Sequence, residues 1–175
     1  MKLTLETDRL LLRPFSVDDA EAMYNGWASD PEVTKYLTWN THQSVDDTRA
    51  VLQKWVAEYR KPERLNIAIV LKSENRLIGG IDVVGYRGGV NGTPVIGYNL
   101  SRAYWGQGYM TEACRAVLNY LFAQGYKEVS IDAFAENIGS NRVIQKCGGV
   151  LQSTEDDYLP LKDMTVAVNR YLIKA

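Results

Sequence analysis

Two glycines one residue apart, Gly106 and Gly108, join a strand-like segment to the most regular helical pattern in the chain. Residues 95–100 form the strand-like segment, and apolar side chains recur at helical spacing from residue 109 to about residue 124. A Gly-x-Gly turn exposes bare N–H groups, and the start of a helix adds unpaired donors and the positive end of the macrodipole. A strand, this turn and a helix start together favour a pocket for a phosphate or pyrophosphate group.

The turn matches neither of two familiar phosphate-binding motifs. The third glycine of the dinucleotide fingerprint is absent after Gly108, and no lysine followed by serine or threonine completes a nucleotide-triphosphate loop. Phosphates would therefore be bound by backbone groups alone. The alternative interpretation, in which Gly106 and Gly108 form only a tight connection, stays open at this point.

Composition and charge argue against several classes of protein. The formal net charge is −1 over 175 residues and basic residues do not cluster, so nothing indicates nucleic-acid binding. Cys114 and Cys147 lie far apart without metal-ligand spacing, and His42 is the single histidine, so no metal site is expected. Cys114 falls on an apolar helical stripe and is interpreted as core. No secretory signal or membrane-spanning run is recognisable, which predicts a cytoplasmic protein without membrane contact.

The chain is predicted to be one domain, residues 1–175, because no repeat, low-complexity segment or linker interrupts it. The predicted strands cover residues 9–15, 65–71, 76–86, 95–100, 128–135, 150 to about 157, and about 163 to 173. Predicted helices begin at Ser16, Pro31 and Ser44 and also span residues 109–124 and 140–147. Pro62 is predicted to end the third helix, and residues 87–93 to form a loop. Helices beside antiparallel hairpins and one strand–helix–strand unit favour a mixed sheet.

The order of these elements, together with three motifs, resembles the GNAT N-acetyltransferase superfamily. Within it the chain is similar to the branch that contains the Rim-type ribosomal-protein N-terminal acetyltransferases. The motifs are TDRLLLRP at 7–14, IGYNL at 96–100 with YWGQGYMTEA at 104–113, and NIGSNR at 137–142 with KCGG at 146–149. The resemblance covers nearly the whole chain, and it is specific because all three segments occur in order at plausible spacing.

The resemblance implies an α/β (α+β) fold with a mixed, mostly antiparallel sheet of about seven strands and flanking helices. The two central parallel strands, through Tyr98 and Ile131, would splay apart in a V that acetyl-CoA threads as co-substrate. Its pantetheine arm would pair with the first of these strands, and its pyrophosphate would lie on the N–H groups of the turn. No metal is implied. The cofactor-binding residues implied are Tyr98, Leu100, Trp105, Gly106, Gln107, Gly108, Tyr109, Met110, Thr111, Asn137, Asn141 and Arg142.

The usual catalytic acid and base of the family are absent. Val95 stands where many members carry a glutamate, and Ile144 where many carry a tyrosine. The resemblance places Ser140 near the CoA sulfur, which makes it the candidate acid, although Ser140 could instead cap its short helix, or do both. A backbone N–H near Asn99 is expected to stabilise the developing oxyanion.

Other carboxylates offer weaker candidates for the base. Asp82 and Asp132 lie inside strand patterns, where each is expected to face solvent or cap a turn. Leu159 stands where some Rim-type enzymes carry a glutamate, and residues 155–158 could substitute only if the alignment slips. In the helical region that shapes the acceptor site of the family lie Trp27, Tyr36, Trp39 and His42. His42 is interpreted as a surface residue rather than a base.

These observations predict an acetyl-CoA-dependent N-acetyltransferase that acts by direct attack of a primary amine. The predicted acceptor is the α-amine of a protein or peptide N-terminus, because a pKa of about 8 leaves a useful neutral fraction, whereas a lysine amine at about 10.4 is mostly charged. Two alternatives stay open. One is acetylation of a small molecule such as an amino acid, polyamine or antibiotic, and the other is an inactive acyl-CoA-binding sensor. A homodimer is common in the family.

Overall fold

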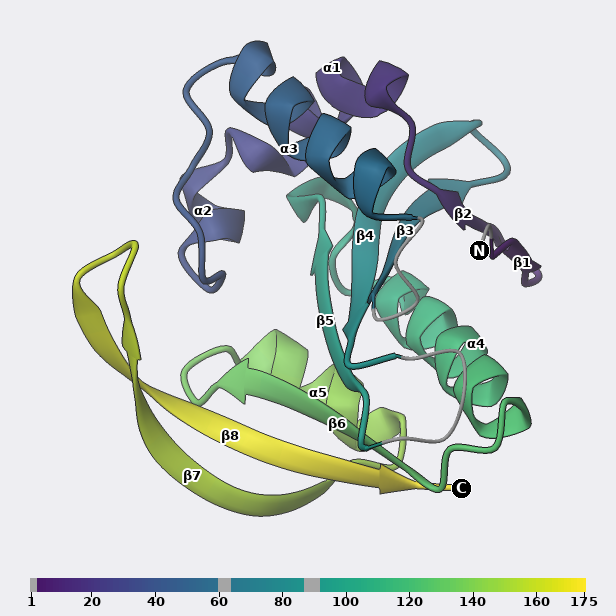
Figure 1. The fold of residues 1–175 in the computed structure, drawn as a ribbon, viewed down its shortest axis with the longest axis vertical. Helices are drawn as coiled ribbons and strands as arrows, with labels where there is room; N and C mark the ends of the chain where they lie inside the picture. Colours follow the sequence, from purple (N-terminus) through teal and green to yellow (C-terminus); the bar gives the residue numbers. More distant parts are fainter. Residues whose placement is uncertain (1–2, 60–63, 87–91) are drawn as a thin grey trace.

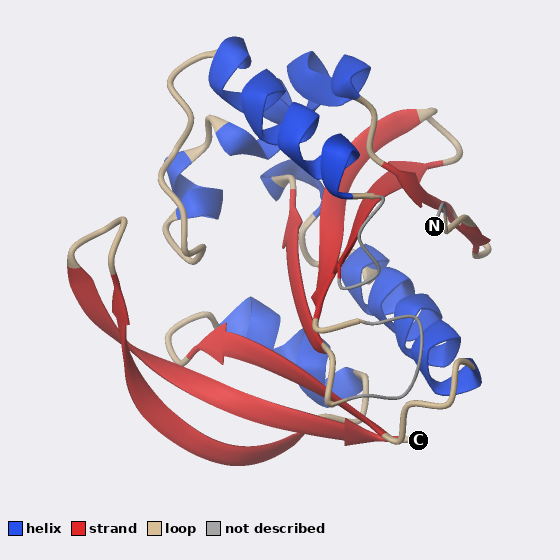
Figure 2. Ribbon diagram, in the orientation of Figure 1, coloured by secondary structure: helices blue, strands red, loops and turns tan. Residues whose placement is uncertain are grey.

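The computed structural model describes residues 3–59, 64–86 and 92–175. Pro62 and most of the predicted loop at residues 87–93 lie outside the described residues. The described part forms one eight-stranded sheet in the order β1-β2-β3-β4-β5-β6-β8-β7, in which only β5 and β6 are parallel (Figure 2). The strands are β1 (Leu5–Glu6), β2 (Leu10–Pro14), β3 (Arg64–Leu71), β4 (Arg76–Val84), β5 (Val95–Leu100), β6 (Glu128–Phe134), β7 (Val150–Leu159) and β8 (Met164–Lys174).

Helices cover both faces of the sheet (Figure 1). On one face lie α1 (Ala20–Met23), α2 (Pro31–Thr34) and α3 (Val45–Glu58), and on the other lie α4 (Tyr109–Ala123) and α5 (Ile138–Lys146). Short turns of other helical types flank them, namely η1 (Val17–Asp19), η2 (Tyr24–Ala28) and η3 (Arg102–Tyr104). The mixed α/β fold predicted from the sequence is confirmed.

Several boundaries differ from those predicted. The short strand β1 gives the sheet eight strands rather than about seven. The first predicted helix is divided into a 3₁₀ turn, a short α-helix and a π-helical turn. Helix α5 begins at Ile138 rather than Ser140, because Asn137 is its N-cap and accepts a hydrogen bond from the Ser140 N–H. A capping residue ahead of the apolar pattern moves a helix start in this way.

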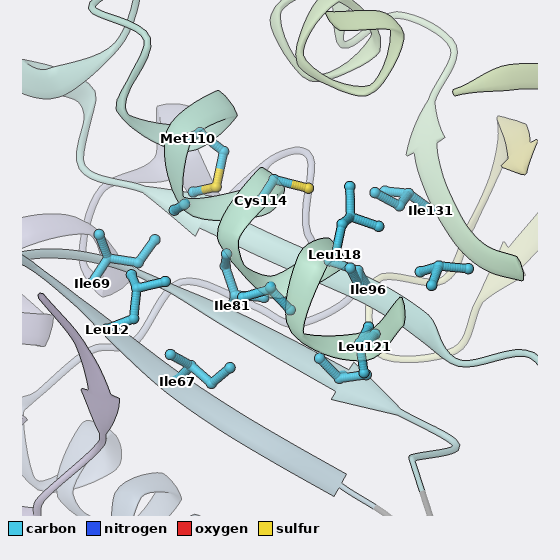
Figure 3. Close-up of a cluster of buried hydrophobic side chains, with 14 of the residues drawn as sticks. Leu12, Ile67, Ile69, Ile81, Ile96, Met110, Cys114, Leu118, Leu121 and Ile131 are labelled. Atoms are coloured by element: carbon cyan, nitrogen blue, oxygen red, sulfur yellow. The ribbon is translucent and has the colours of Figure 1, made fainter. Parts of the chain in front are cut away.

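Helix α4 builds the larger core by packing across the middle of the sheet (Figure 3). Its buried face consists of Met110, Ala113, Cys114, Val117, Leu118 and Leu121. These side chains meet β-strand residues such as Ile67, Ile81 and Ile96. The stripe places Cys114 fully inside, as its position in the helical pattern predicted. This packing fixes the start of α4 directly beside the end of β5.

The opposite face of the sheet carries a second core. Phe15, Met23, Trp27 and Leu52 pack there against alternate residues of β3 and β4. On β4, Ile81 and Val83 belong to the α4 core, whereas a Cβ atom on Gly80 would lie 2.9 Å from the Phe15 ring. Successive strand residues point to opposite faces, so Gly80, Asp82 and Val84 face α1–α3.

The central strands β5 and β6 separate almost as soon as they meet. They pair only through Val95 with Ser130 and Ile96 with Ile131, after which β6 continues beside β8 alone. Figure 1 shows β5 and β6 diverging, with the long β7–β8 hairpin curving away beneath them. The V-shaped opening that the family resemblance implied is therefore present.

The tip of the β7–β8 hairpin returns to the first helical layer. The Asn40 side-chain amide donates to the Leu161 carbonyl at 2.8 Å, and the Lys162 ammonium donates to the Thr34 carbonyl at 2.5 Å. The hairpin tip thus contacts the end of α2 and the segment that follows it. These contacts lie on the side of the opening away from α4 (Figure 1).

Candidate active site

The outer half of β5 presents an open backbone edge to the splay. The Ser130 N–H donates to the Pro94 carbonyl, and the Ser101 N–H donates to Ile78 on β4. Backbone groups of successive strand residues point to alternate sides, so even-numbered residues of β5 face β6 and odd-numbered residues face β4. Among the described residues, no strand is paired with this edge beyond Ile96. The backbone groups of Tyr98 and the N–H of Leu100 therefore face the opening.

This alternation bears on the predicted oxyanion donor. Asn99 pairs with Gly80 of β4, and the Asn99 carbonyl lies 2.5 Å from where a Cβ atom of Gly79 would be. Its N–H is therefore directed into the sheet rather than into the splay. The backbone donors that face the opening nearest to it belong to Tyr98 and Leu100.

The glycine turn has the geometry that favours anion binding. Gly106 has φ +73° and Gly108 has φ +80°, a left-handed conformation that side chains rarely adopt. Gly108 is the N-cap of α4 and has no side chain to cap it, and the first intrahelical bond runs from the Glu112 N–H to the Gly108 carbonyl. Among the described residues, no acceptor is bonded to the N–H groups of residues 109–111. These donors and the helix dipole can hold a pyrophosphate.

Arg9, the residue just before β2, holds the turn in place. Its guanidinium donates to the Gln107 carbonyl at 3.0 Å and to the Glu112 carboxylate at 2.6 Å, and it lies 4.3 Å from the centre of the Tyr109 ring. The Thr7 hydroxyl donates to the same carboxylate at 2.6 Å. These contacts hold the pKa of Glu112 below its ordinary value despite its partial burial. The opening strand and the glycine motif are therefore one structural unit.

Several predicted cofactor residues act on the turn itself through their side chains. Trp105 Nε1 donates to the Leu100 carbonyl at 2.8 Å, and Gln107 Nε2 donates to the Ala103 carbonyl at 3.1 Å. Met110 is buried in the core beneath the helix start. Contacts of these residues with a cofactor through their backbone groups stay predictions.

A cavity of about 800 Å³ adjoins the turn, between β1–β2 and the outer face of α4. Three cations line it, Arg9, Arg115 and Lys146, together with Gly108 and Glu112. The Arg115 guanidinium also donates to the Lys146 carbonyl at 2.7 Å, which ties α4 to α5. Glu6 and Asp8 line it as well, so its three cations face three carboxylates, and it adjoins the glycine turn at Gly108.

Ser140 lies within the first turn of α5, on the α4 side of β5. Its hydroxyl is 2.9 Å from the Tyr98 hydroxyl, which also lies 3.1 Å from the Ser140 carbonyl. Burial raises the pKa of Tyr98 above its ordinary value, so its hydroxyl stays protonated and can donate. The interpretation of Ser140 as the helix cap is wrong, because that position belongs to Asn137. The Tyr98 side chain was not predicted to take part, and only the fold brings it to Ser140.

Asn141 holds α5 against the sheet. Its side-chain amide donates to the carbonyls of Phe134 at 3.0 Å and Asn137 at 2.7 Å, and its oxygen accepts from Asn169 at 2.8 Å and Tyr171 at 2.7 Å. All four hydrogen-bonding positions of the amide are therefore used within the protein. Arg142, the next predicted cofactor residue, is exposed.

Asn141→Ala should therefore affect stability rather than cofactor binding. Removing the amide breaks four hydrogen bonds, although the carbonyls of Phe134 and Asn137 each keep a backbone N–H donor. We expect the free energy of unfolding to fall by about 2–4 kcal/mol. Denaturant unfolding measures this loss, and the KM for acetyl-CoA measured below the melting temperature should stay within about twofold of the wild-type value. A large rise in KM at unchanged stability would contradict this expectation.

The side of β5 away from α4 carries the residues expected to meet an acceptor. Burial lowers the pKa of His42, whose Nδ1 is 2.7 Å from the Thr48 hydroxyl and whose ring lies 4.9 Å from the Trp39 ring. His42 is therefore half-buried and neutral, and not the surface residue that was predicted. Asp132 is ion-paired with Arg170 at 2.5 Å rather than facing solvent alone.

Arg170 gathers three carboxylates on this side of the sheet. It contacts Asp132 on β6 and, on β7, Asp157 at 2.7 Å and Glu155 at 3.4 Å. Burial lowers the pKa of the arginine, but Asp157 and Asp132 outweigh this effect and raise it above its ordinary value. One cation against three anions leaves this cluster with a net negative charge.

Comparison with known proteins agrees with the fold. The model of the acetyltransferase (GNAT) domain matches residues 9–150, and the chain belongs to the GNAT acetyltransferase family. It is 28% identical over 168 residues to the "Uncharacterized N-acetyltransferase p20" of Bacillus licheniformis, which covers 94% of this chain and 92% of that protein. The protein is thus an N-acetyltransferase by family.

Solved structures give the same result. An acetyltransferase of the GNAT family from Bacillus anthracis superposes with a TM-score of 0.83 at 28% identity, over 98% of both chains. A Salmonella typhimurium acetyl transferase that modifies the N-terminal serine of a ribosomal subunit protein gives 0.83 at 19% identity, over 97% and 96%. The self-immunity acetyltransferase MccE, solved with acetyl-CoA and AMP, gives 0.84 at 20% identity, over 97% and 94%. At these last identities the likeness concerns the fold alone.

No group of three or more histidine, cysteine, aspartate or glutamate side chains among the described residues is arranged to hold a metal ion. No helix in residues 3–59, 64–86 or 92–175 is long and apolar enough to span a membrane.

Proposed function

We propose that this protein transfers the acetyl group of acetyl-CoA to the α-amine of a protein or peptide N-terminus. The observation that carries the proposal is the open backbone edge of Tyr98 and Leu100 directly beside the uncapped glycine turn. An extended pantetheine arm can pair with such an edge as an added strand while the N–H groups of residues 109–111 bind the pyrophosphate. Acetyl-CoA, when bound, supplies the activated thioester.

The residues around the splay supply position and charge stabilisation. Holding the amine and the thioester together accounts for a large part of such a rate enhancement. The N–H groups of Tyr98 and Leu100 can donate to the oxygen on which negative charge develops. Ser140 can give its proton to the departing sulfur, and the Tyr98 hydroxyl, 2.9 Å from the Ser140 hydroxyl, helps to hold it in place.

The choice of an α-amine rests on the acidity of the acceptor amine and on a protein of similar structure. An α-amine with a pKa of about 8 loses its proton near neutral pH far more readily than a lysine amine. The Salmonella typhimurium neighbour acetylates an N-terminal serine, which supports the same acceptor class here.

A second candidate acceptor is a small cationic amine. The negative cluster of Asp132, Glu155 and Asp157 around Arg170 favours a molecule with more than one positive charge, such as a polyamine.

An acceptor screen with thermal unfolding tests the proposal. Acetyl-CoA at millimolar concentration should raise the melting temperature, because a ligand that binds only the folded state stabilises it by mass action. Release of free thiol should be seen with short peptides that carry a free N-terminus, and not with the same peptides acetylated at that end. Spermidine and an aminoglycoside test the second candidate. A chain that is not stabilised by acetyl-CoA and releases no thiol with any of these amines would contradict the proposed function.

A further inference from the structure

A row of three positions crosses the sheet on the face opposite α4. Asn66 on β3 pairs with Asp82 on β4, and Asp82 pairs with Gly97 on β5. Cross-strand neighbours point their side chains to the same face. The Asp82 carboxylate reaches toward β5, since a Cβ atom on Gly97 would lie 2.8 Å from Asp82 Oδ1. Gly97 follows the last pair that joins β5 to β6, Ile96 with Ile131, so Asp82 lies where the splay opens.

Two amides beside Asp82 carry polar atoms without partners among the described residues. Asn66 is 2% exposed, and neither Oδ1 nor Nδ2 of its side chain forms a hydrogen bond there. Asn99 lies two positions from Gly97 on the same face, and its buried Oδ1 also forms no hydrogen bond with the described residues. Buried amides are normally satisfied by protein, water or a ligand. A polar molecule bound beside Asp82 could supply the partners that these atoms lack.

Among the described residues, Arg64 is the charged group in contact with Asp82. Arg64 Nη2 from β3 lies 3.5 Å from Asp82 Oδ2, and β5 offers no titratable side chain at residues 95, 97 and 99. From α3, the Tyr59 hydroxyl donates to the Asn66 carbonyl rather than to the carboxylate. Loss of hydration raises the pKa of Asp82 above its ordinary value, and Arg64 opposes only part of this effect. The side chain is still 33% exposed, so a ligand can reach it.

We propose that Asp82 is the general base of the acetyl transfer, and that its carboxylate binds the acceptor ammonium above Gly97 and removes a proton from it. The proposal rests on acetyl transfer to an amine as the function of the site. Asp82 differs from the family positions occupied here by Val95 and Ile144, which carry no ionisable group. It also differs from Asp132, whose Oδ2 is paired with Arg170 at 2.5 Å.

The protons and electron pairs balance in this scheme. Asp82 takes one proton from the ammonium, and the freed lone pair forms the N–C bond while the C–S bond breaks with its pair on sulfur. The nitrogen releases a second proton to solvent and keeps the third in the amide. Sulfur takes a proton from Ser140, which solvent restores. Because side chains alternate along β5, Asp82 above Gly97 and the Ser140–Tyr98 pair lie on opposite faces and approach one thioester from its two sides.

Asp82→Asn provides the central test, with a short peptide bearing a free N-terminus as acceptor. The wild-type kcat should persist below the amine pKa, because the carboxylate can deprotonate bound ammonium. The variant can use only amine that is already neutral, so its kcat should fall about tenfold per pH unit below about pH 8. At pH 7 we expect the variant to be slower by about a hundredfold or more.

Stability separates this role from a structural one. The folded state binds the Asp82 proton more tightly than the unfolded state, whose value is near 3.8, so ionisation lowers stability as pH rises through the raised folded value. Asp82→Asn should therefore melt no lower than the wild type at pH 8. A lowered melting temperature with the wild-type pH profile would mean that Asp82 only pairs with Arg64, and would overturn the proposal.

Two further variants sharpen the result. Gly97→Ala keeps the carboxylate but displaces it, and should lower kcat with a smaller change in the KM for acetyl-CoA. Asp132→Asn removes the other strand carboxylate paired with an arginine, and it can weaken acceptor binding but should keep the wild-type pH profile of kcat. If kcat falls steeply below about pH 8 in Asp132→Asn but not in Asp82→Asn, the base is Asp132 instead.

A binding measurement keeps the test independent of turnover. The carboxyl carbon resonance of Asp82, identified by its absence in Asp82→Asn, should shift when the peptide amine or spermidine is added with CoA present. Failure of the wild type to acetylate any amine bears on the proposed function and is seen without any variant. An unmoved Asp82 resonance in an enzyme that does acetylate amines would overturn the assignment of the base alone.

Discussion

Replacing Gly108 by valine is expected to raise the KM for acetyl-CoA by about a hundredfold or more. A side chain at this N-cap would stand between the pyrophosphate and the N–H groups of residues 109–111, and each charge-assisted hydrogen bond lost costs about 1.5–3 kcal/mol. The φ of +80° adds a conformational cost of roughly 1–2 kcal/mol to the folded state. Steady-state kinetics at saturating acceptor measures the change in KM, and thermal unfolding measures the strain.

Gly148→Val is the matched control for this strain. Gly148 has φ +89°, has no atom within 4 Å of an added Cβ, where Gly108 has only the end of the Arg9 side chain at 3.5 Å, and lies at the far end of α5. We expect it to lose stability as Gly108→Val does and to retain the wild-type KM. Equal KM values for wild type and Gly108→Val would show that the phosphates bind elsewhere, the cavity beside Arg115 and Lys146 being the next place to examine.

Ser140→Ala is expected to lower kcat by about a hundredfold while leaving the affinity for acetyl-CoA and the melting temperature nearly unchanged. Proton donation to the sulfur acts mainly in the transition state, so kcat and kcat/KM should fall together. The loss of stability should be small because Asn137, not Ser140, caps the helix. Tyr98 also keeps a partner in the Ser140 carbonyl at 3.1 Å.

Asn137→Ala separates the contribution of the cap from that of the hydroxyl. Losing the bond from the Ser140 N–H to Asn137 Oδ1 should cost about 1 kcal/mol of stability. Ser140→Ala should show the opposite pattern, with turnover lost and stability kept. A Ser140→Ala enzyme with wild-type kcat would exclude the serine as the acid, and Tyr98→Phe would then test whether the neighbouring hydroxyl acts without it.

The two faces of β5 explain how one strand can serve both substrates. Its even-numbered residues include Tyr98, whose side chain points toward α4 and α5, where Ser140 lies. Its odd-numbered residues, Gly97 and Asn99, face the row that contains Asp82. A site that is reached from both sides of the sheet needs the sheet to be open at that point, and the early separation of β5 from β6 provides the opening.

Much of the fold could be predicted from the sequence because its signals are local. The apolar stripe of α4, the turn residues of the β3–β4 hairpin, the capping box at Ser44 and the paired glycines each depend on neighbours a few residues apart. The same applies to the phosphate-binding turn, whose donors are backbone groups that need only the φ angles glycine allows. The family motifs then indicated the chemistry.

The tertiary structure decided what depends on residues far apart in the chain. Whether Ser140 capped a helix, and whether Tyr98 stood beside it, could not be predicted from spacing, since 42 residues separate the two side chains. The environments of Asp82 and Asp132 differ for the same reason, because strand pairing places one against a glycine and an unpaired amide and the other against Arg170. A sequence pattern determines which residues share a face of an element, whereas the pKa and partners of a side chain depend on the strands and helices packed around it.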